Sequence, residues 1–388
     1  MSGAPLTSKL LPMRVLHVLG NVGMTGVETF VLTLTAAQRR RGDGVYLACA
    51  EDGRRELLDA AQALGVKTTL FLSRGEQRHW VGKALSFKAR WQRWRLLVRV
   101  LRDAKPDVLH VHAVGIDGLE SFLAALWTRT RFVVTHHATL SFFAPLRNFL
   151  SDVTLWLERH FAHAVVAPYS AAAGEWQEAG VPARRLHTIP FCVDIDRFAP
   201  TGRPPDDEVT TFHLWMPARL VEGKGHKELI EATAQLRPKY PRLRLTLAGA
   251  GPLEEDIRAH VERLGLGAVV SVGYVPHEEM PARMAKAHAV VLPSRMRGET
   301  FPIAMLEAMA LGLPSVGTRW FGIPEIVVDG ETGLLIPSGD VAALVNALQR
   351  LVADSNLVRR MGEAARRRAV EKFSARAISE RYAALYRD

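Results

Sequence analysis

The sequence predicts an α/β protein built from two doubly wound, parallel-sheet domains. The chain has 388 residues, which is long for a single hydrophobic core. Short apolar segments alternate with segments of helical periodicity in both halves, as in repeated strand–loop–helix units. Residues 199–208, rich in proline and charge, are expected to form the linker between the two domains.

Seven strands are expected in the first half, at residues 14–20, 45–50, 66–72, 106–112, 131–137, 164–168 and 186–190. A loop with glycines at positions 20, 23 and 26 joins the first strand to a helix that runs to about Arg41. Such a loop brings backbone N–H groups close to an anion. Its spacing does not match G-x-G-x-x-G, so a plain strand–helix turn remains the alternative.

The second half repeats the alternation, with strands expected at residues 211–216, 244–248, 269–272, 289–294, 315–317 and 333–337. A helical tail follows from Val341 to Asp388. We therefore expect an N-terminal domain over residues 1–198 and a C-terminal domain over residues 209–373. The last helix, residues 374–388, is expected to pack back on the first domain.

Two carboxylates eight residues apart, Glu299 and Glu307, mark the most informative stretch. Pro302 fits the first position of a helix and Gly312 its C-terminal stop, so Glu307 lies in the second turn. The N-terminus of that helix suits a phosphate, and the carboxylates can accept hydrogen bonds from hydroxyl groups. This pattern indicates a sugar nucleotide, and two solvated glutamates on an ordinary helix are the alternative.

Two cations lie on one predicted strand–helix loop of the second half, Arg219 and Lys224. An arginine fork and a lysine point charge together suit a diphosphate. Gly249 and Gly251 follow the next strand of the same sheet, and ligands bind beyond the C-terminal ends of such strands. Each residue taken alone could be a surface residue without a ligand.

Four stretches, taken together, resemble a retaining glycosyltransferase of the GT-B fold, family-4 type. They are residues 26–28, residues 219–225, residues 249–252, and Glu299 to Glu307 followed by residues 311–314. The resemblance extends from Val15 to about Tyr386. It implies two Rossmann-like domains that face each other across a cleft.

The resemblance also implies roles for individual residues. Arg219 and Lys224 would hold the donor diphosphate and stabilise the leaving nucleotide. Glu307 would accept hydroxyls of the ribose, and Glu299 would contact hydroxyls of the transferred sugar, as would the first-domain histidine His137. The remaining donor-binding positions are Gly23, Gly26, Gly251, Tyr274, Val275, Ser294, Thr300, Phe301, Pro302 and Ile303. No metal is implied, because the cationic side chains take the place of Mg²⁺, and no cofactor is implied beyond the nucleotide sugar as co-substrate.

The first half of the chain carries most of the positive charge. Residues 1–195 hold 24 Lys and Arg against 16 Asp and Glu, a balance of +8 out of the total of +10. Residues 78–102 carry eight Lys and Arg and no acid, interleaved with tryptophans. A basic amphipathic helix with tryptophans is typical of a membrane-surface contact, for which Arg90, Trp91, Arg93 and Trp94 are the candidates. A helix that covers the sheet, with its other side in solvent, is the alternative.

His110 and His112 lie on one face of a predicted strand. A single such pair is more often structural than metal-binding, and no third ligand occurs at a recognisable spacing. Two cysteines, no signal-peptide pattern and no apolar run long enough to span a bilayer favour the cytoplasm, with peripheral attachment to the inner face of the plasma membrane.

The expected function is metal-independent, retaining transfer of a hexose from a nucleotide diphosphate sugar. The acceptor is expected to be lipid-linked, a polysaccharide or another glycan, in cell-envelope or exopolysaccharide synthesis. The partners are thus the donor, the acceptor and an anionic membrane surface, without nucleic acid. A nucleotide-sugar epimerase of the same architecture and a non-catalytic protein that binds anionic surfaces are the alternatives.

Overall fold

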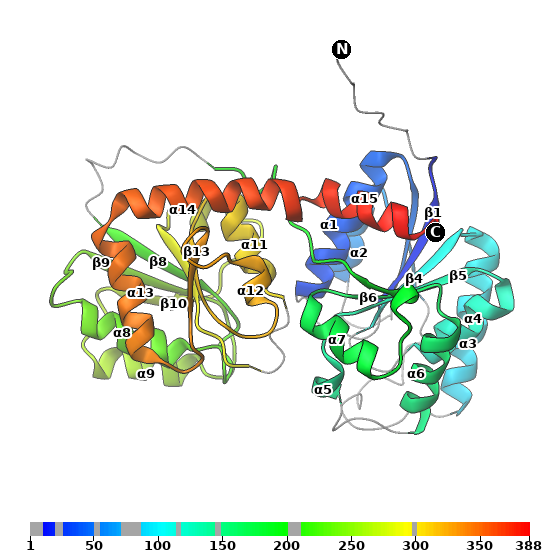
Figure 1. The fold of residues 1–388 in the computed structure, drawn as a ribbon, viewed down its shortest axis with the longest axis horizontal. Coiled ribbons are helices and arrows are strands. Elements are labelled where there is room, and N and C mark those ends of the chain that lie inside the picture. Colours follow the sequence, from blue (N-terminus) through cyan, green and yellow to red (C-terminus); the bar gives the residue numbers. More distant parts are fainter. Residues whose placement is uncertain are drawn as a thin grey trace, which may run out of the picture. The chain divides into compact units, whose positions relative to one another are not determined.

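The computed structural model describes residues 11–19, 26–49, 55–70, 87–113, 118–143, 149–200, 211–296 and 301–388. The chain divides into two compact units, each of which can be followed in Figure 1. Unit 1 consists of Met1–Ala167, Ala173–Ile189 and Ile378–Asp388, and unit 2 consists of Pro168–Ala172 and Pro190–Ala377.

Unit 1 is built on a seven-stranded parallel sheet with the order β3-β2-β1-β4-β5-β6-β7. Its strands are β1 (Arg14–Leu19), β2 (Gly44–Cys49), β3 (Lys67–Leu70), β4 (Val108–Ala113), β5 (Arg131–His136), β6 (Ala164–Ala167) and β7 (Leu186–Thr188). The helices around the sheet are α1 (Gly26–Arg41), α2 (Arg55–Ala63), α3 (Phe87–Ala104), α4 (Leu119–Thr128), α5 (Leu140–Phe143), α6 (Phe149–Phe161), α7 (Ser170–Glu178) and α15 (Ala375–Leu385). Because helices cover a parallel sheet, its strands are buried, and all six residues of β4 are buried.

Unit 2 is built on a six-stranded parallel sheet with the order β10-β9-β8-β11-β12-β13. Its strands are β8 (Phe212–Pro217), β9 (Leu243–Ala248), β10 (Val270–Gly273), β11 (Ala289–Leu292), β12 (Ser315–Thr318) and β13 (Gly333–Ile336). Its helices are α8 (His226–Leu236), α9 (Glu254–Arg263), α10 (Met280–Met284), α11 (Ile303–Ala310), α12 (Ile323–Ile326), α13 (Val341–Ala353) and α14 (Ser355–Arg368).

The predicted fold class is confirmed, and the strands lie close to the predicted positions. In both sheets the strand order reverses beside the first strand, between β1 and β4 in unit 1 and between β8 and β11 in unit 2. Loops that leave the C-terminal ends of the two strands at such a point turn to opposite faces of the sheet and leave room for a ligand. The topology therefore marks the C-terminal ends of β1 and β4 in unit 1, and of β8 and β11 in unit 2, as candidate sites.

The boundary between the units differs from the expected linker. After the short stretch Pro168–Ala172, the chain enters unit 2 again at Pro190, ahead of residues 199–208. Residues 201–208 lie outside the described part. Val193 is already buried in unit 2 and forms a bridge with Ser374. Its N–H donates to the carbonyl of Phe373 at 2.9 Å, and the N–H of Ala375 donates to its carbonyl at 3.0 Å. These bonds place the segment before the proline-rich stretch in unit 2.

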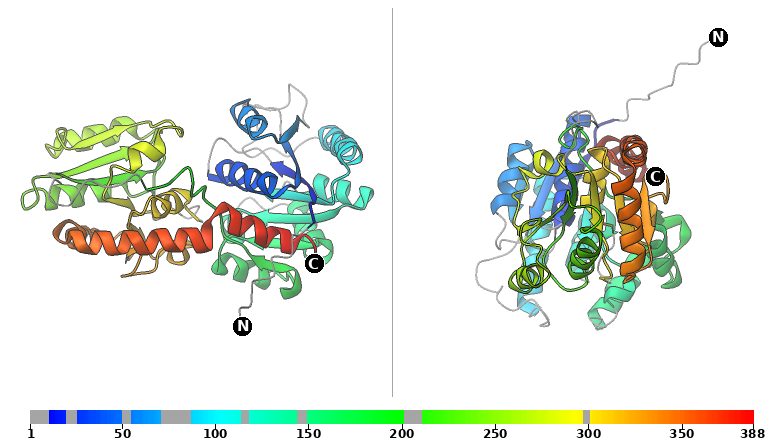
Figure 2. Two further views of the ribbon diagram at one scale, coloured as in Figure 1. Left: turned by 90° about the horizontal axis from the view of Figure 1, so that it is seen from above. Right: turned by 90° about the vertical axis from the view of Figure 1, so that its left-hand side faces the viewer.

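The C-terminal residues Ile378–Asp388 return to unit 1, where α15 lies alongside α1 (Figure 2). Tyr382 and Tyr386 are fully buried there. Arg131 of β5 donates to the carbonyl of Tyr386 at 2.5 Å, which satisfies an acceptor at the helix end.

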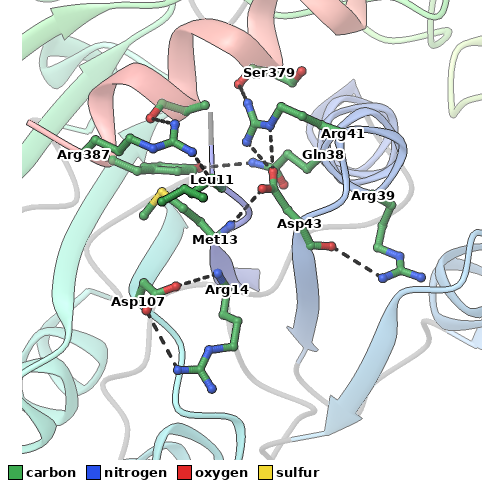
Figure 3. A network of polar contacts seen from close by, with 12 residues as sticks. Leu11, Met13, Arg14, Gln38, Arg39, Arg41, Asp43, Asp107, Ser379 and Arg387 are labelled. Atoms are coloured by element: carbon green, nitrogen blue, oxygen red, sulfur yellow. Dashed lines mark hydrogen bonds and ion pairs between the residues drawn. The ribbon is translucent and has the colours of Figure 1, made fainter. Parts of the chain in front are cut away.

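Asp43 is the centre of a polar network that ties α15 to the start of the sheet (Figure 3). Its carboxylate accepts from the N–H of Met13 at 3.0 Å and from the guanidinium of Arg41. Arg41 also donates to the carbonyl of Ser379, and Arg387 donates to the carbonyl of Leu11. Bonds to a buried carboxylate are stronger than neutral ones, so this network fixes the helix against β1.

Close backbone contacts join two strand–helix loops of unit 2, those after β8 and β9. The N–H of Leu220 donates to the carbonyl of Ala250, and the carbonyl of Leu220 accepts from the N–H of Leu253. A Cβ at Gly249 would lie 2.0 Å from the carbonyl oxygen of Ala218, and one at Gly251 would lie 2.4 Å from that of Leu220. Only glycine permits this approach, so these glycines set the shape of the loops.

We expect Gly249→Ala to lower the melting temperature of unit 2 by about 5 °C or more, because the added methyl group meets fixed backbone. Gly273→Ala is the matched control, since its Cβ would have no neighbour nearer than 4.0 Å. Calorimetry of both variants measures the effect. Equal melting temperatures would show that the loops can move apart at little cost.

Candidate functional site

The loop between β8 and α8 holds the two predicted diphosphate-binding cations, Arg219 and Lys224. Arg219 is exposed and Lys224 is half-buried. Gly223 and Gly225, on either side of the lysine, have φ of +82° and +88°, which favours glycine. The loop thus folds sharply at the C-terminal end of β8, beside the point where the strand order reverses.

The segment after β11 holds this loop in place. The N–H of Arg295 donates to the carbonyl of Gly223 at 2.8 Å, and the Arg295 guanidinium pairs with Glu222 at 3.2 Å and with Glu228 at 3.3 Å. A Cβ at Gly225 would lie 2.4 Å from the carbonyl oxygen of Pro293. The loops after β8 and β11 are therefore in direct backbone contact.

Ser294 has a different place from the one predicted. It is fully buried, and its hydroxyl donates to the carbonyl of Gly223 at 3.3 Å. Its own carbonyl accepts from the hydroxyl of Thr318 at 2.6 Å. The Ser294 side chain thus holds the loop that carries Lys224, and it is not accessible to a nucleotide sugar. A small polar residue after an apolar strand suits either role, so the sequence could not distinguish them.

Helix α11 begins where the sequence predicts a phosphate-binding N-terminus. Pro302 is the residue before the first helical turn, one position earlier than expected, and Ile303 opens the helix. The first N–H groups of any helix lack intrahelical acceptors and carry partial positive charge. Phe301 is buried against the rings of Phe191 and Phe373, with centroids 5.6 and 6.0 Å away. Only its backbone is therefore available to a ligand.

Glu307 lies in the second turn of α11 and is 6% exposed. Burial raises the pKa of this carboxyl from 4.5 to about 8, and the positive charge of Arg197 partly opposes the rise. At neutral pH the free protein therefore holds Glu307 mainly as the neutral acid. A group that donates hydrogen bonds to it, such as a sugar hydroxyl, favours the ionised form.

Arg197 is a residue that the sequence analysis missed. It donates to the carbonyl of His277 at 2.7 Å, and its backbone N–H is held by the carboxylate of Asp194 at 3.1 Å. Arg197 precedes the proline-rich stretch and belongs to no motif. Its charge acts on Glu307, 110 positions further along the chain, only because the segment after Pro190 folds into unit 2.

Other predicted donor-binding residues lie on other loops and elements. Gly251 lies in the loop after β9, against Leu220. Tyr274, directly after β10, is 71% exposed, whereas Val275 is buried. Gly26 is the exposed first residue of α1. Gly23, Glu299 and Thr300 lie outside the described residues.

In unit 1 a cluster of histidines lies on β1 and β4, the strands at which the order reverses, and directly after β5. His137, predicted to contact the transferred sugar, follows β5 and is 3% exposed. Its Nε2 lies 3.1 Å from Nδ1 of His112, and Nε2 of His112 lies 2.9 Å from Nδ1 of His17. His110 lies in register with His17 on the neighbouring strand. The sequence pattern marks His110 and His112 but not His17, whose contribution depends on the pairing of β1 with β4.

Burial keeps these imidazoles neutral. It lowers the pKa of His17 to about 4 and that of His137 to about 3. The pKa values of His110 and His112 lie well below the ordinary value, because of burial first and the neighbouring imidazoles second. None of the four therefore carries a charge at neutral pH.

Helix α3 differs from the predicted membrane contact at two of its arginines. Arg90 pairs with the buried carboxylate of Glu120 at 2.6 Å. Arg93 is 4% exposed and lies on the buried face with Leu97, Val98 and Leu101, so it cannot reach a membrane. Trp91, a candidate for the membrane contact, is 39% exposed. Arg93 lies one helical turn before Leu97 and shares its buried face, so Trp91 points toward the exposed side of the helix.

Exposed apolar side chains gather on α3, α4 and α6, with α4 packed against both of the other helices. The rings of Trp91 and Trp94 are 5.7 Å apart, and Trp94 is 5.7 Å from Trp127 on α4. We call the exposed members the aromatic surface: Trp91, Leu123, Leu126, Trp127, Phe149, Trp156 and Phe161. Among the described residues no helix is long and apolar enough to cross a membrane.

Comparison with known proteins accounts for both units. Residues 204–368 match the model of the glycosyl transferases group 1, and residues 24–197 match the model of glycosyltransferase family 4. The chain is 30% identical over 305 residues to the putative glycosyltransferase EpsD of Bacillus subtilis, covering 74% of this chain and 78% of that protein.

Two further relatives match over shorter stretches. The putative colanic acid biosynthesis glycosyltransferase WcaL of Escherichia coli is 37% identical over 190 residues, which are 48% of this chain and 46% of WcaL. A GDP-mannose-dependent phosphatidylinositol monomannoside mannosyltransferase of Mycolicibacterium smegmatis is 35% identical over 219 residues, 53% and 56% of the two chains. The chain thus spans about half the length of these two relatives.

Solved structures share the fold over nearly the whole length. A glycosyltransferase from Rickettsia africae gives a TM-score of 0.77 at 15% identity, covering 97% of this chain and 98% of the other. Anabaena HepE in complex with UDP gives 0.77 at 21% identity, covering 96% and 99%. By sequence and by fold, this chain belongs to the group 1, family-4 glycosyltransferases of the GT-B fold.

Proposed function

We propose that this chain transfers a hexose, with retention of configuration and without a metal ion, from a nucleotide diphosphate sugar to a lipid-linked, polysaccharide or other glycan acceptor. The observation that carries the proposal is the set of joined loops at the strand-order reversal of unit 2. There, Arg219 and Lys224 lie on a loop that is in backbone contact with the segment preceding α11.

Two positive side chains and a helix N-terminus suit the charge of a diphosphate. Arginine offers a planar fork of donors, lysine a compact charge, and the helix its first N–H groups. As the sugar leaves, negative charge grows on the diphosphate, and groups already aimed at that position stabilise it without rearrangement. This supports the proposed independence from Mg²⁺.

Glu307 is assigned to the nucleotide end of the donor. Its burial disfavours the ionised form, and ribose hydroxyl groups that donate to the carboxylate offset that cost. Glu299 is assigned to hydroxyls of the transferred sugar, with backbone groups of residues 301–303 nearby.

The proposed reaction is a substitution on one face of the sugar. The bond from the anomeric carbon to the diphosphate oxygen breaks, and a bond to the acceptor oxygen forms on the same side. The proton of the acceptor hydroxyl passes to the departing diphosphate. The leaving group thus serves as the base, and no protein nucleophile is required.

We propose exopolysaccharide or cell-envelope synthesis at the inner face of the plasma membrane as the setting. One relative is named a putative colanic acid biosynthesis glycosyltransferase. Another is named a phosphatidylinositol monomannoside mannosyltransferase. The aromatic surface, with exposed Arg95, Arg99 and Arg102 on the acid-free part of α3, suits anionic lipid headgroups.

Lys224→Ala is expected to lower kcat/KM by ~10²–10³, because it removes a preorganised cation from the leaving group. Purified protein would be incubated with a panel that includes UDP-glucose and GDP-mannose, while nucleotide release and sugar products are followed. Lys227→Ala is the control, since Lys227 is exposed three residues further on. No donor turnover, or equal rates in both variants, would contradict the transferase. Epimerised sugar that stays on its nucleotide would indicate the epimerase instead.

Glu307→Gln is expected to remove a pH dependence of stability. Between about pH 4.5 and 8 the unfolded chain loses the Glu307 proton while the folded chain keeps it, so wild-type stability falls as the pH rises. A single such proton contributes a slope of about 1.4 kcal/mol per pH unit. In urea unfolding, the free energy of unfolding of the variant relative to the wild type should therefore be higher at pH 8 than at pH 5. The exposed Glu255→Gln should follow the wild type, and a parallel course of all three proteins would show that Glu307 is already ionised.

Vesicle flotation tests the aromatic surface. We expect binding to vesicles of phosphatidylglycerol and phosphatidylcholine but not to phosphatidylcholine alone. Arg95→Glu with Arg99→Glu should lower the partition at least about fivefold for each charge, and Trp127→Ser should lower it as well. Leu264→Ser, an exposed leucine of unit 2, is the control. Undiminished binding of the arginine and tryptophan variants would leave this surface without a membrane role.

A further inference from the structure

A continuous chain of hydrogen bonds connects the amide of Gln38 to the ring of His137. Oε1 of Gln38 lies 2.8 Å from Nε2 of His17, whose Nδ1 lies 2.9 Å from Nε2 of His112. Nδ1 of His112 in turn lies 3.1 Å from Nε2 of His137. All four residues are buried, so water does not compete for these bonds.

The direction of this chain follows from its first bond. A neutral imidazole has one N–H donor and one acceptor nitrogen. The amide oxygen of Gln38 can only accept, so His17 carries its proton on Nε2 and accepts at Nδ1. His112 must then donate from Nε2 and accept at Nδ1, and His137 must donate from Nε2.

A second branch from the same amide agrees with this direction. Nε2 of Gln38 lies 3.5 Å from the hydroxyl of Tyr386, which lies 2.7 Å from Nδ1 of His110. The amide nitrogen can only donate, so the tyrosine oxygen accepts from it and the tyrosine O–H is directed to His110 in the arrangement that agrees with the first branch. His110 then donates from Nε2 to the hydroxyl of Thr135 at 2.8 Å.

His17, His110 and His112 have ligand atoms within 4.8 Å of one another, a spacing that could also hold a metal ion. However, each ring nitrogen of the three already has a hydrogen-bond partner. An ion would have to break several of these bonds in a fully buried place. The cluster is thus complete as a hydrogen-bonded network.

We propose that Gln38 is a positioning residue that holds His17, His110, His112 and His137 in the tautomer protonated on Nε2, so that His137 presents Nδ1 as a hydrogen-bond acceptor. An acceptor at this position selects a group that donates, such as a sugar hydroxyl. That last step rests on the proposed function, whereas the tautomers themselves do not.

Burial supports a fixed tautomer. The lowered pKa values keep the rings neutral at pH 7. Because each neutral ring has one donor and one acceptor nitrogen, all hydrogen bonds of the chain must point the same way. Reversal would require Gln38 to turn its amide and all four rings to move their protons together. A single side chain, 99 positions before His137, therefore governs the chemistry that His137 offers.

The test is a two-bond ¹H–¹⁵N correlation spectrum of the full chain labelled with ¹⁵N-histidine, which distinguishes the two tautomers and the imidazolium. Through-space NMR contacts between neighbouring rings, whose centroids are 5.2 and 5.3 Å apart, assign the resonances of His17, His112 and His137. We expect all of them, and His110, to be protonated on Nε2 at pH 7. A His137 protonated on Nδ1, or a mixture in the wild type, would overturn the inference.

Two variants separate Gln38 from the general packing of the core. Gln38→Met keeps the length of the side chain but removes the acceptor, and His137 should then show both tautomers. Tyr386→Phe removes only the second branch, so His137 should keep the Nε2 form. Equal spectra of His137 in wild type and Gln38→Met would refute the role of Gln38. If Gln38→Met does not fold, the wild-type spectrum still decides the tautomers.

UDP-glucose and GDP-mannose, added separately to the labelled wild type, test the functional step. A donor whose hydroxyl meets His137 should shift the Nδ1 resonance and leave the tautomer unchanged. The predicted tautomers without any such shift would uphold the inference about Gln38 and contradict the proposed contact of His137 with the sugar.

Discussion

The reversal of strand order beside β1 and β8 is the constraint on which the rest of the molecule depends. In a parallel sheet all strands end at one edge, and only at the reversal do neighbouring loops turn apart. In unit 2 this edge receives Arg219 and Lys224 after β8 and the segment leading to α11 after β11. In unit 1 the two strands at the reversal carry buried histidines, His17 on β1 and His110 and His112 on β4. Both units therefore place polar residues on or directly after the strands at which the order reverses.

The two units use that position in different ways. Unit 2 leaves Arg219 exposed and Lys224 half-buried, and glycines whose backbones touch neighbouring carbonyl groups shape the loops around them. Unit 1 buries its polar groups and must pair them, because an unpaired buried donor or acceptor costs about 1–3 kcal/mol. The helix α15 serves this pairing, since the hydroxyl of Tyr386 contacts both His110 and Gln38. The C-terminus of the chain is thus part of the polar interior of unit 1.

Glu307 shows how burial changes the protonation of a carboxyl group. Isolated from water, the carboxyl holds its proton at neutral pH, and Arg197 only partly opposes this. Hydroxyl groups that donate hydrogen bonds to this carboxyl would favour its ionised form. On α3, α4 and α6 burial is incomplete, since the tryptophans and phenylalanines of the aromatic surface remain exposed.

The sequence by itself determined the features that depend on local pattern. Continuous apolar runs located the strands, and the glycines and the proline around α11 located its ends, because strand burial and helix capping act over a few residues. The motif cations were found for the same reason. Only the tertiary structure decided which distant residues meet. The bond between His17 and His112 joins positions 95 apart, and that between His110 and Tyr386 joins positions 276 apart. The buried place of Arg93 and the effect of Arg197 on Glu307 likewise depend on how whole elements pack. Periodicity within one element carries no information about the element that will cover it.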